Sequence, residues 1–493
     1  MVDSPSDVVP NHISPVFWMG LSIVSATLYI LAMWSKRNSL KLIATLAIIL
    51  FIYSSAYFFW FMPGSDSHYF RGLNEYFIET GDLNFNESYH SYYQWPLFFV
   101  LNKIAHIIGV NLRFFEFVLF GLFGLLYGVS LYSLFHKSSR DGACFAVLSY
   151  FIMMWWYIDY QYVPFSLGFG FLLILFMLDK RKDKNSATIL SMLVIFASMT
   201  LTHSFLPVFF ISYAFIKYIL LSKDRTHVNI FLMTLIIYFT VLTFRAVEFL
   251  ELSVEALIGF GSDVYVRLAE TMFVQATTPL HELAQMISRS IFIITGLVAA
   301  SGFIILLLKR KLGYTNIALL LSGGAYALAS AVLPILGSRA FAIIVIPLSL
   351  GVTYFQETKF KKYFQYLFLI IIILFAFMPL HSSFTLTTRQ IPFQTEPDYQ
   401  AANFWINYYH PNERSLMVAD FRTEWYLFPK VRSNNVTFEG DNEIEDYDCI
   451  LYTIGLEKAF LRQNYTGENL IQKMNEYNVF YSSGRTQILV KRD

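Results

Sequence analysis

The sequence predicts a polytopic α-helical membrane protein of about twelve transmembrane helices, followed by a small C-terminal extracytoplasmic α/β domain. Of the 493 residues, 56% are hydrophobic and 14% are charged, whereas soluble domains carry about 25% charged residues. Apolar runs of bilayer-crossing length recur along residues 1–380. Residues 381–493 instead alternate short strand-like and helical runs, which indicates a separate α/β domain.

The transmembrane helices are predicted from apolar runs, because a helix needs about 20 apolar residues to cross the hydrocarbon core. The predicted spans are residues 15–34, 42–62, 113–135, 142–158, 163–178, 187–202, 205–221, 228–245, 288–308, 315–335, 338–356 and 363–380.

The connections between these spans form two alternating sets, and one set is short and basic. Its basic residues are Lys36, Arg37, Lys41, Lys137, Arg140, Lys180, Arg181, Lys182, Lys184, Lys223, Arg225, Lys309, Arg310, Lys311, Lys359, Lys361 and Lys362. Short loops rich in Lys and Arg stay on the cytoplasmic side. We therefore expect a multi-pass protein of the cell membrane, with both termini and the C-terminal domain outside the cytoplasm.

A polar loop, residues 63–112, follows the second span and is predicted to lie outside. From Asp66 to Thr80 its apolar residues recur at helical spacing, and Gly81 supplies the helix stop. We predict a helix lying in the membrane interface. It would hold Asp66 in its first turn, at the level of the lipid headgroups.

The predicted interfacial helix also has a polar face. Arg71, Asn74 and Glu75 are expected to lie there, and Arg71 and Glu75 are spaced to form an i, i+4 ion pair. A second apolar helix, Leu97 to Ile108, is too short to span, so we expect it to be interfacial or re-entrant.

Further candidate residues lie at outer helix ends. Asp159 follows the fourth span, His203 and Arg339 lie at the outer ends of the sixth and eleventh, and Arg245 opens the outer segment 245–288. Each has a purely structural alternative. A charge at a helix end can snorkel to the interface, a histidine at a helix turn can be a satisfied polar residue, and Asp66 can simply favour a helix N-terminus.

These residues carry a resemblance to a known superfamily. The run Asp66 to Arg71, DSHYFR, resembles the acidic–tyrosine–histidine–arginine pattern of the oligosaccharyltransferase branch of the GT-C membrane glycosyltransferases. It is also placed like the acidic pair of the protein mannosyltransferase and lipid-A aminoarabinose transferase branches. Asp159 is similar to a second outer acidic site of the oligosaccharyltransferases, and Asn475 to Val490 looks like the end of archaeal members. Ser67 leaves the acidic pair incomplete, and the tryptophan-rich tail motif is absent.

The resemblance implies an inverting transfer of a sugar from a polyprenyl-phosphate donor to a glycan, lipid or protein acceptor on the outer face. Asp66 would be the catalytic base. The residues implied in substrate binding are His68, Arg71, Asp159, His203, Arg245 and Arg339. Asp66 and Asp159 are also candidate ligands of a divalent ion, Mg²⁺ or Mn²⁺, and the sequence leaves the metal requirement open.

Other functions are weighed against this one. A net charge of +1 gives no reason to expect a nucleic-acid partner. A transporter or flippase of lipid-linked saccharides would need the same outer cavity but no catalytic base. A receptor-like membrane protein, with the tail as binding module, is a third alternative.

Overall fold

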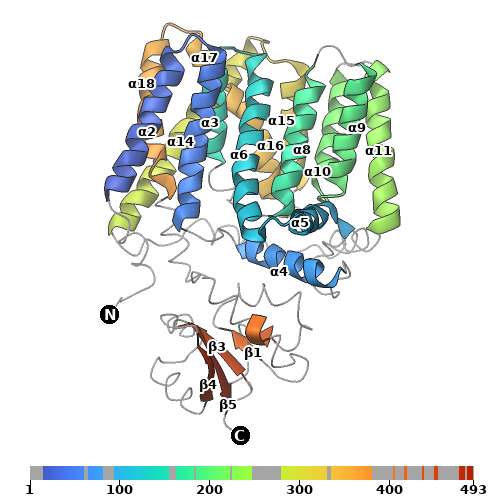
Figure 1. Cartoon of the computed structure of the whole chain (residues 1–493). Helices are drawn as coiled ribbons and strands as arrows, with labels where there is room; N and C mark the ends of the chain where they lie inside the picture. The colour runs from blue at the N-terminus through green and yellow to red at the C-terminus, as the bar shows by residue number, and fades with distance from the viewer. Residues whose placement is uncertain are drawn as a thin grey trace.

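The protein is a bundle of helices with a small β-sheet beyond one end (Figure 1). The computed structural model describes residues 15–59, 65–81, 94–154, 163–181, 185–221, 225–246, 279–329, 335–379, 403–405, 416–418, 436–437, 449–453, 477–482 and 486–491.

Helices occupy every range in which the sequence predicts a span. Their bounds are α2 Pro15–Trp34, α3 Asn38–Phe59, α6 Leu112–His136, α7 Ala143–Met153, α8 Pro164–Asp179, α9 Ser186–Thr200, α10 Leu206–Ala214, η2 Phe215–Leu221, α11 Arg225–Arg245, α14 Pro279–Leu308, α15 Tyr314–Ala329, α16 Ile335–Leu350, α17 Val352–Gln356 and α18 Lys361–Phe375. The outer loop adds α4 Ser65–Thr80 and α5 Leu97–Ile107.

Several described helices can cross a membrane by length and composition. Five meet that requirement, and they are Val16–Trp34, Phe114–His136, Val228–Arg245, Glu282–Leu308 and Arg339–Gln356. The other apolar segments that could be assessed, such as Asn38–Tyr53 within α3, are shorter, so the count of twelve spans stays a prediction. Large apolar side chains such as Leu190, Ile236 and Leu297 are exposed, as expected for surfaces that face lipid.

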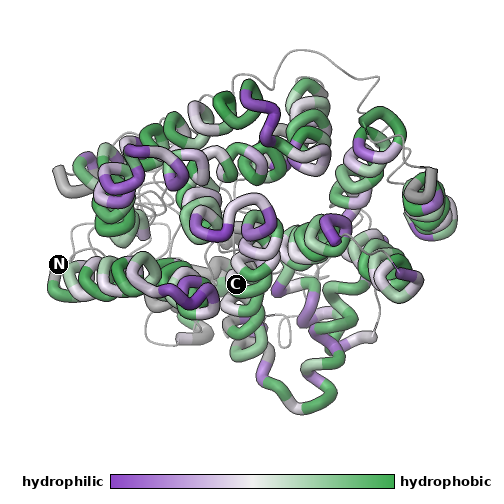
Figure 2. Tube along the Cα trace, turned by 90° about the horizontal axis from the view of Figure 1, so that it is seen from above, coloured by the Kyte–Doolittle hydropathy of each residue, from purple (hydrophilic) through white to green (hydrophobic). Residues whose placement is uncertain are grey.

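The core of the bundle is built around α7. All of its residues, Ala143–Met153, are buried, and α3, α6, α14 and α16 pack on it. A helix surrounded by protein needs no polar face, which explains why this run is apolar on every side. Seen from above, the tubes are mostly hydrophobic, and hydrophilic segments gather at the turns (Figure 2).

One predicted span, 205–221, is not a uniform α-helix. It is α10 followed by the π-helix η2. The hydroxyls of Tyr213 and Tyr218 both donate to the buried carboxylate of Asp179, to which Lys217 is also paired. A π-helix bonds i to i+5, so two tyrosines five residues apart can reach the same carboxylate.

A second predicted span, 338–356, is divided at Gly351 into α16 and α17. A β-carbon on Gly351 would collide with the carbonyl oxygen of Ala299 and with the amide nitrogen of Phe303 in α14. Two backbones approach here as closely as they do where small residues line a membrane helix contact. The break thus follows from helix packing.

The outer-loop helices α4 and α5 lie across the end of the bundle that faces the sheet (Figure 1). Both end close to the predicted positions, α4 before Gly81 and α5 next to Ile108, and the following glycines, Gly81 and Gly109, have positive φ angles of 74° and 81°. The predicted polar face of α4 is covered in part, because Arg71 and Asn74 are buried. Helix α4 therefore packs against protein on both faces.

The tail contains a five-stranded sheet in the order β2-β1-β3-β5-β4. Strand β1 (Leu416–Val418) pairs in parallel with β2 (Val436–Thr437) and β3 (Cys449–Thr453), while β5 (Thr486–Lys491) is antiparallel to β3 and β4 (Tyr477–Ser482). The sequence has strand-like runs at residues 415–419, 449–453, 479–481 and 487–490, which correspond to β1, β3, β4 and β5, and it does not predict β2. The sequence also has helical runs at residues 456–463 and 468–477, and these lie outside the described residues except for Tyr477, which begins β4.

Candidate functional site

The site is built on the contact between α4 and α5. Phe70 and Leu73 of α4 pack against Phe98 and Phe99 of α5, and their side chains form a small buried cluster. Lys103 of α5 donates to the carbonyl oxygens at the C-terminal end of α4, at 3.3 Å from Phe77 O. A cation there satisfies carbonyls that the helix leaves without partners, so α4 is fixed on α5.

The α5 helix is in turn fixed to the turn between α9 and α10. The amide of Leu97 donates to the carbonyl oxygen of Leu201 at 3.0 Å. His203 lies in the same turn and is fully buried. The outer loop and this turn thus form one connected unit.

Four side chains meet beside this turn, and we call them the Arg339 cluster: Phe165, His203, Phe205 and Arg339. The Arg339 guanidinium carbon lies 5.2 Å from the ring centre of Phe205 and 5.8 Å from that of Phe165. The rings of Phe165 and His203 lie 5.4 Å apart, edge to face. The cluster joins the starts of α8 and α16 to the α9–α10 turn. These distances lie within cation–π range.

His203 is held as a neutral imidazole. Burial lowers its pKa well below the usual value, and the neighbouring charge of Arg339 lowers it further. The amide of Phe205 donates to His203 Nδ1 at 3.2 Å, so the ring proton is on Nε2. His203 therefore presents a neutral N–H donor beside a permanent cation.

Arg339 retains hydrogen-bonding capacity. Its Nη1 atom is buried and has no hydrogen-bond acceptor among the described residues. A guanidinium held between aromatic rings is oriented but keeps its donors, and its planar fork matches two phosphate oxygens. The cluster therefore has the chemistry of a phosphate site: one fixed positive charge and one neutral donor.

The remaining predicted site residues have mixed outcomes. Asp66 and His68 lie on α4, but their side chains are outside the described part of the structure, as is the whole of Asp159. Arg71 is buried and paired with Glu75 at 2.9 Å, so the predicted ion pair is confirmed. Arg245 is the last residue of α11 and is exposed. The structure thus brings together His203 and Arg339.

Three polar residues in or next to the outer loop are buried, and the sequence analysis did not identify them as candidate site residues. They are Gln94, Asn102 on α5 and Glu116 on α6. Glu116 is the single acid in the apolar run Leu112–His136, and an ionisable residue inside such a run is a signal of function in itself. Asn102 donates to the Phe98 carbonyl at 2.8 Å.

The fold was compared with known proteins. No family model matches the chain, and no curated protein matches it. Among solved structures it is similar to the crystal structure of ArnT from Cupriavidus metallidurans bound to undecaprenyl phosphate, with a TM-score of 0.50 and 11% sequence identity. The match covers 91% of this chain and 97% of that one.

The match extends over nearly the whole of both chains, so the similarity to ArnT is not confined to one part of the fold. ArnT is a GT-C glycosyltransferase. The chain therefore shares its overall fold with this ArnT structure, which is the fold that the resemblance of its outer loop implies.

Proposed function

We propose that the protein transfers a sugar from a polyprenyl-phosphate donor to an acceptor on the outer face of the membrane. One observation carries the proposal. Within a fold that is shared with ArnT bound to undecaprenyl phosphate, the Arg339 cluster places a cation and a neutral N–H donor beside the outer loop. The donor phosphate would bind there, at the membrane boundary where a polyprenyl tail can remain in lipid.

The reaction is a displacement at the anomeric carbon. The acceptor hydroxyl oxygen forms the new bond, the bond to the phosphate oxygen breaks, and polyprenyl phosphate leaves with both electrons. The carboxylate of Asp66 takes the hydroxyl proton as general base, in the manner of inverting glycoside hydrolysis. Arg339 and His203 stabilise the charge that develops on the departing phosphate.

The proposal includes the arrangement in the membrane. Twelve spans would place the basic turns in the cytoplasm, and both termini outside. Residues 1–380 would form the transmembrane domain, with the outer loop 63–112 and outer segment 245–288. Residues 381–493 would cover the site as an extracytoplasmic α/β domain, supported by its sheet.

A divalent ion is a further element of this proposal. Asp66 and Asp159 are the two carboxylates that would hold Mg²⁺ or Mn²⁺ through oxygen ligands. Asp66 would act either together with a divalent ion or as a base without one, and adding a chelator to the transfer assay distinguishes these two possibilities. Loss of transfer that added metal restores means that Asp66 acts with a metal, and unchanged transfer means that it acts as a base alone.

The test compares the parent protein with Asp66→Asn in reconstituted vesicles that contain polyprenyl-phosphate-linked sugars and a native lipid and glycan extract. Asparagine keeps the size of the side chain but cannot accept a proton. Transfer should fall by about 100-fold or more, since general-base catalysis contributes about 10²–10⁴-fold. Equal transfer by the two proteins would remove Asp66 from the mechanism.

The rival function is a transporter or flippase of lipid-linked saccharides. It would move the donor across the bilayer without forming a new glycosidic bond, and Asp66→Asn would leave that movement largely intact. Movement of the donor without any release of polyprenyl phosphate would favour the transporter over the transferase.

A further inference from the structure

A second positively charged region lies at the opposite end of the bundle from α4 and α5. The turn after α6 and the turn after α8 border a cavity of about 870 Å³, which we call the basic cavity. It is lined by His136, Lys137, Ser138, Ser139, Arg140, Lys180, Arg181, Asn185 and Thr188. Its volume falls in the range of small-molecule sites.

Two lysines of the basic cavity also hold its walls together. Lys137 Nζ donates to the carbonyl oxygen of Lys180 at 2.7 Å, and Lys180 Nζ donates to Ser138 Oγ at 2.9 Å and to the carbonyl oxygen of Leu134. The ends of α6 and α8 are thus cross-linked by their own cations.

Three cations of the basic cavity, Arg140, Lys180 and Arg181, have no carboxylate partner within the described structure. Among the described residues, no carboxylate lines the cavity. His136 Nδ1 is buried and has no hydrogen-bond partner in that same part of the chain. A bound anion would supply a negative charge for these cations and hydrogen-bond acceptors for their N–H groups.

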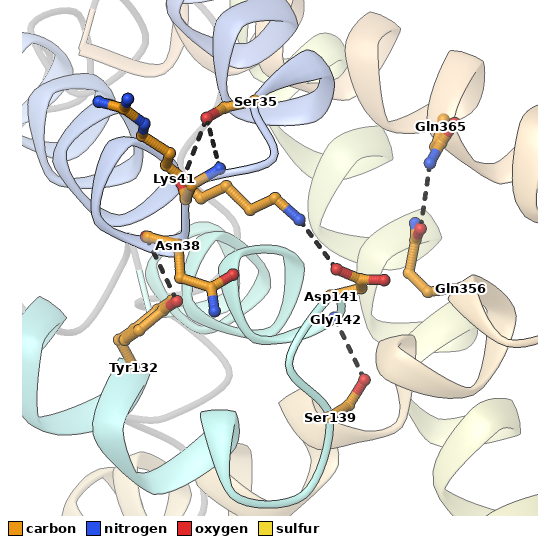
Figure 3. Close-up of polar contacts among 10 residues, drawn as sticks. Ser35, Asn38, Lys41, Tyr132, Ser139, Asp141, Gly142, Gln356 and Gln365 are labelled. Carbon is orange, nitrogen blue, oxygen red and sulfur yellow. Dashed lines mark hydrogen bonds and ion pairs between the residues drawn. The ribbon is translucent and has the colours of Figure 1, made fainter.

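A neighbouring cavity at the same end shows the contrasting case. It measures about 90 Å³, and it is lined by Lys41, Asp141 and Lys361 among others. There Lys41 is paired with Asp141 at 2.9 Å, and Gln365 donates to Gln356 at 3.2 Å (Figure 3). Lys41 has a carboxylate partner in this cavity, whereas no carboxylate is among the described residues that line the basic cavity.

We propose that the basic cavity binds a phosphate-bearing anion, supplied by the headgroup of an anionic membrane phospholipid. Basic pockets between membrane helices recognise such headgroups, and arginine forks match phosphate oxygens. The N-terminus of α9 also lies at the cavity, where Asn185 caps the amide of Thr188. The site is independent of the Arg339 cluster and of sugar transfer.

The electrostatic surroundings of Lys180 favour a bound anion. Burial lowers its pKa to about 8, and the charges of Lys137 and Lys217 act in the same direction. A bound phosphate would offset these neighbouring charges and favour the ammonium form.

The test measures binding of phosphatidic acid and of phosphatidylcholine to the purified full-length protein by native mass spectrometry. The variant is Arg140→Gln/Arg181→Gln, which removes two exposed guanidiniums and keeps the lysines that hold the helices. The parent should retain phosphatidic acid and not phosphatidylcholine. The variant should bind phosphatidic acid about tenfold or more weakly, because hydrogen bonds to charged groups are lost.

The matched control is Lys359→Gln/Lys362→Gln, which removes two exposed cations, one from the turn before α18 and one from the first turn of α18. It should bind phosphatidic acid like the parent. An equal loss in the control, or equal binding of phosphatidylcholine, would overturn the proposal by showing general charge attraction. If glycerol 3-phosphate or inorganic phosphate displaces the lipid at comparable concentration, the phosphate site stands and the lipid source is overturned.

Discussion

At the residue scale, the candidate site depends on two side chains that are far apart in the sequence. His203 lies in a turn and Arg339 lies in α16, and the charge of one lowers the pKa of the other. The sequence identified both because each lies at an outer helix end. It could not show that they are neighbours, since that contact depends on how α8, α10 and α16 pack.

The buried imidazole predicts how stability depends on pH. His203 is neutral when folded, but in the unfolded chain it takes up a proton below about pH 6.5. Its contribution to stability is therefore complete above that pH and is lost as the pH falls, by at most about 1.4 kcal/mol per pH unit. In detergent, unfolding of the parent between pH 7.5 and 5 should show this loss.

The comparison for that prediction is His203→Asn, which keeps an acceptor for the Phe205 amide but does not titrate. Its stability should fall less steeply between the same pH values. The same slope in both proteins would mean that His203 is not held neutral in the fold.

At the element scale, the sequence predicted most helix positions and several helix ends. Gly81 and Gly109 end their helices because glycine readily adopts the positive φ found there. The π-helix after α10 and the break at Gly351 were not predicted. The π-helix and the break both depend on contacts with other helices, so the hydropathy of the sequence cannot predict them.

The close contact at Gly351 predicts a large effect of a small change. In Gly351→Ala the new methyl group would meet the α14 backbone at Ala299 and Phe303. Since backbone atoms cannot rotate away, the helices must shift, and the free energy of unfolding should decrease by roughly 1–3 kcal/mol. Titration with SDS, which unfolds membrane proteins, measures this decrease in the free energy of unfolding.

The control is Gly296→Ala in α14, because an added β-carbon there meets nothing within 4 Å. This change should be neutral or stabilising, by up to about 1 kcal/mol. If both alanine variants unfold alike, close packing does not explain the break between α16 and α17.

At the scale of the whole molecule, the two ends of the bundle differ in chemistry. One end carries α4, α5 and the Arg339 cluster, and the other carries the basic turns and the basic cavity (Figure 1). The sequence predicted this polarity from the distribution of Lys and Arg. It did not predict that Arg71 and Asn74 are buried, because an amphipathic pattern alone cannot show that protein covers a polar face.

The central claim is that the carrier phosphate binds at the Arg339 cluster. The most direct measurement is a cryo-electron microscopy map of the protein with an added polyprenyl phosphate. The account predicts phosphate density within about 3 Å of the Arg339 guanidinium, on the side of His203, and loss of that density in Arg339→Gln. Polyprenyl phosphate found only in the basic cavity, or density at the cluster that persists in Arg339→Gln, would contradict it.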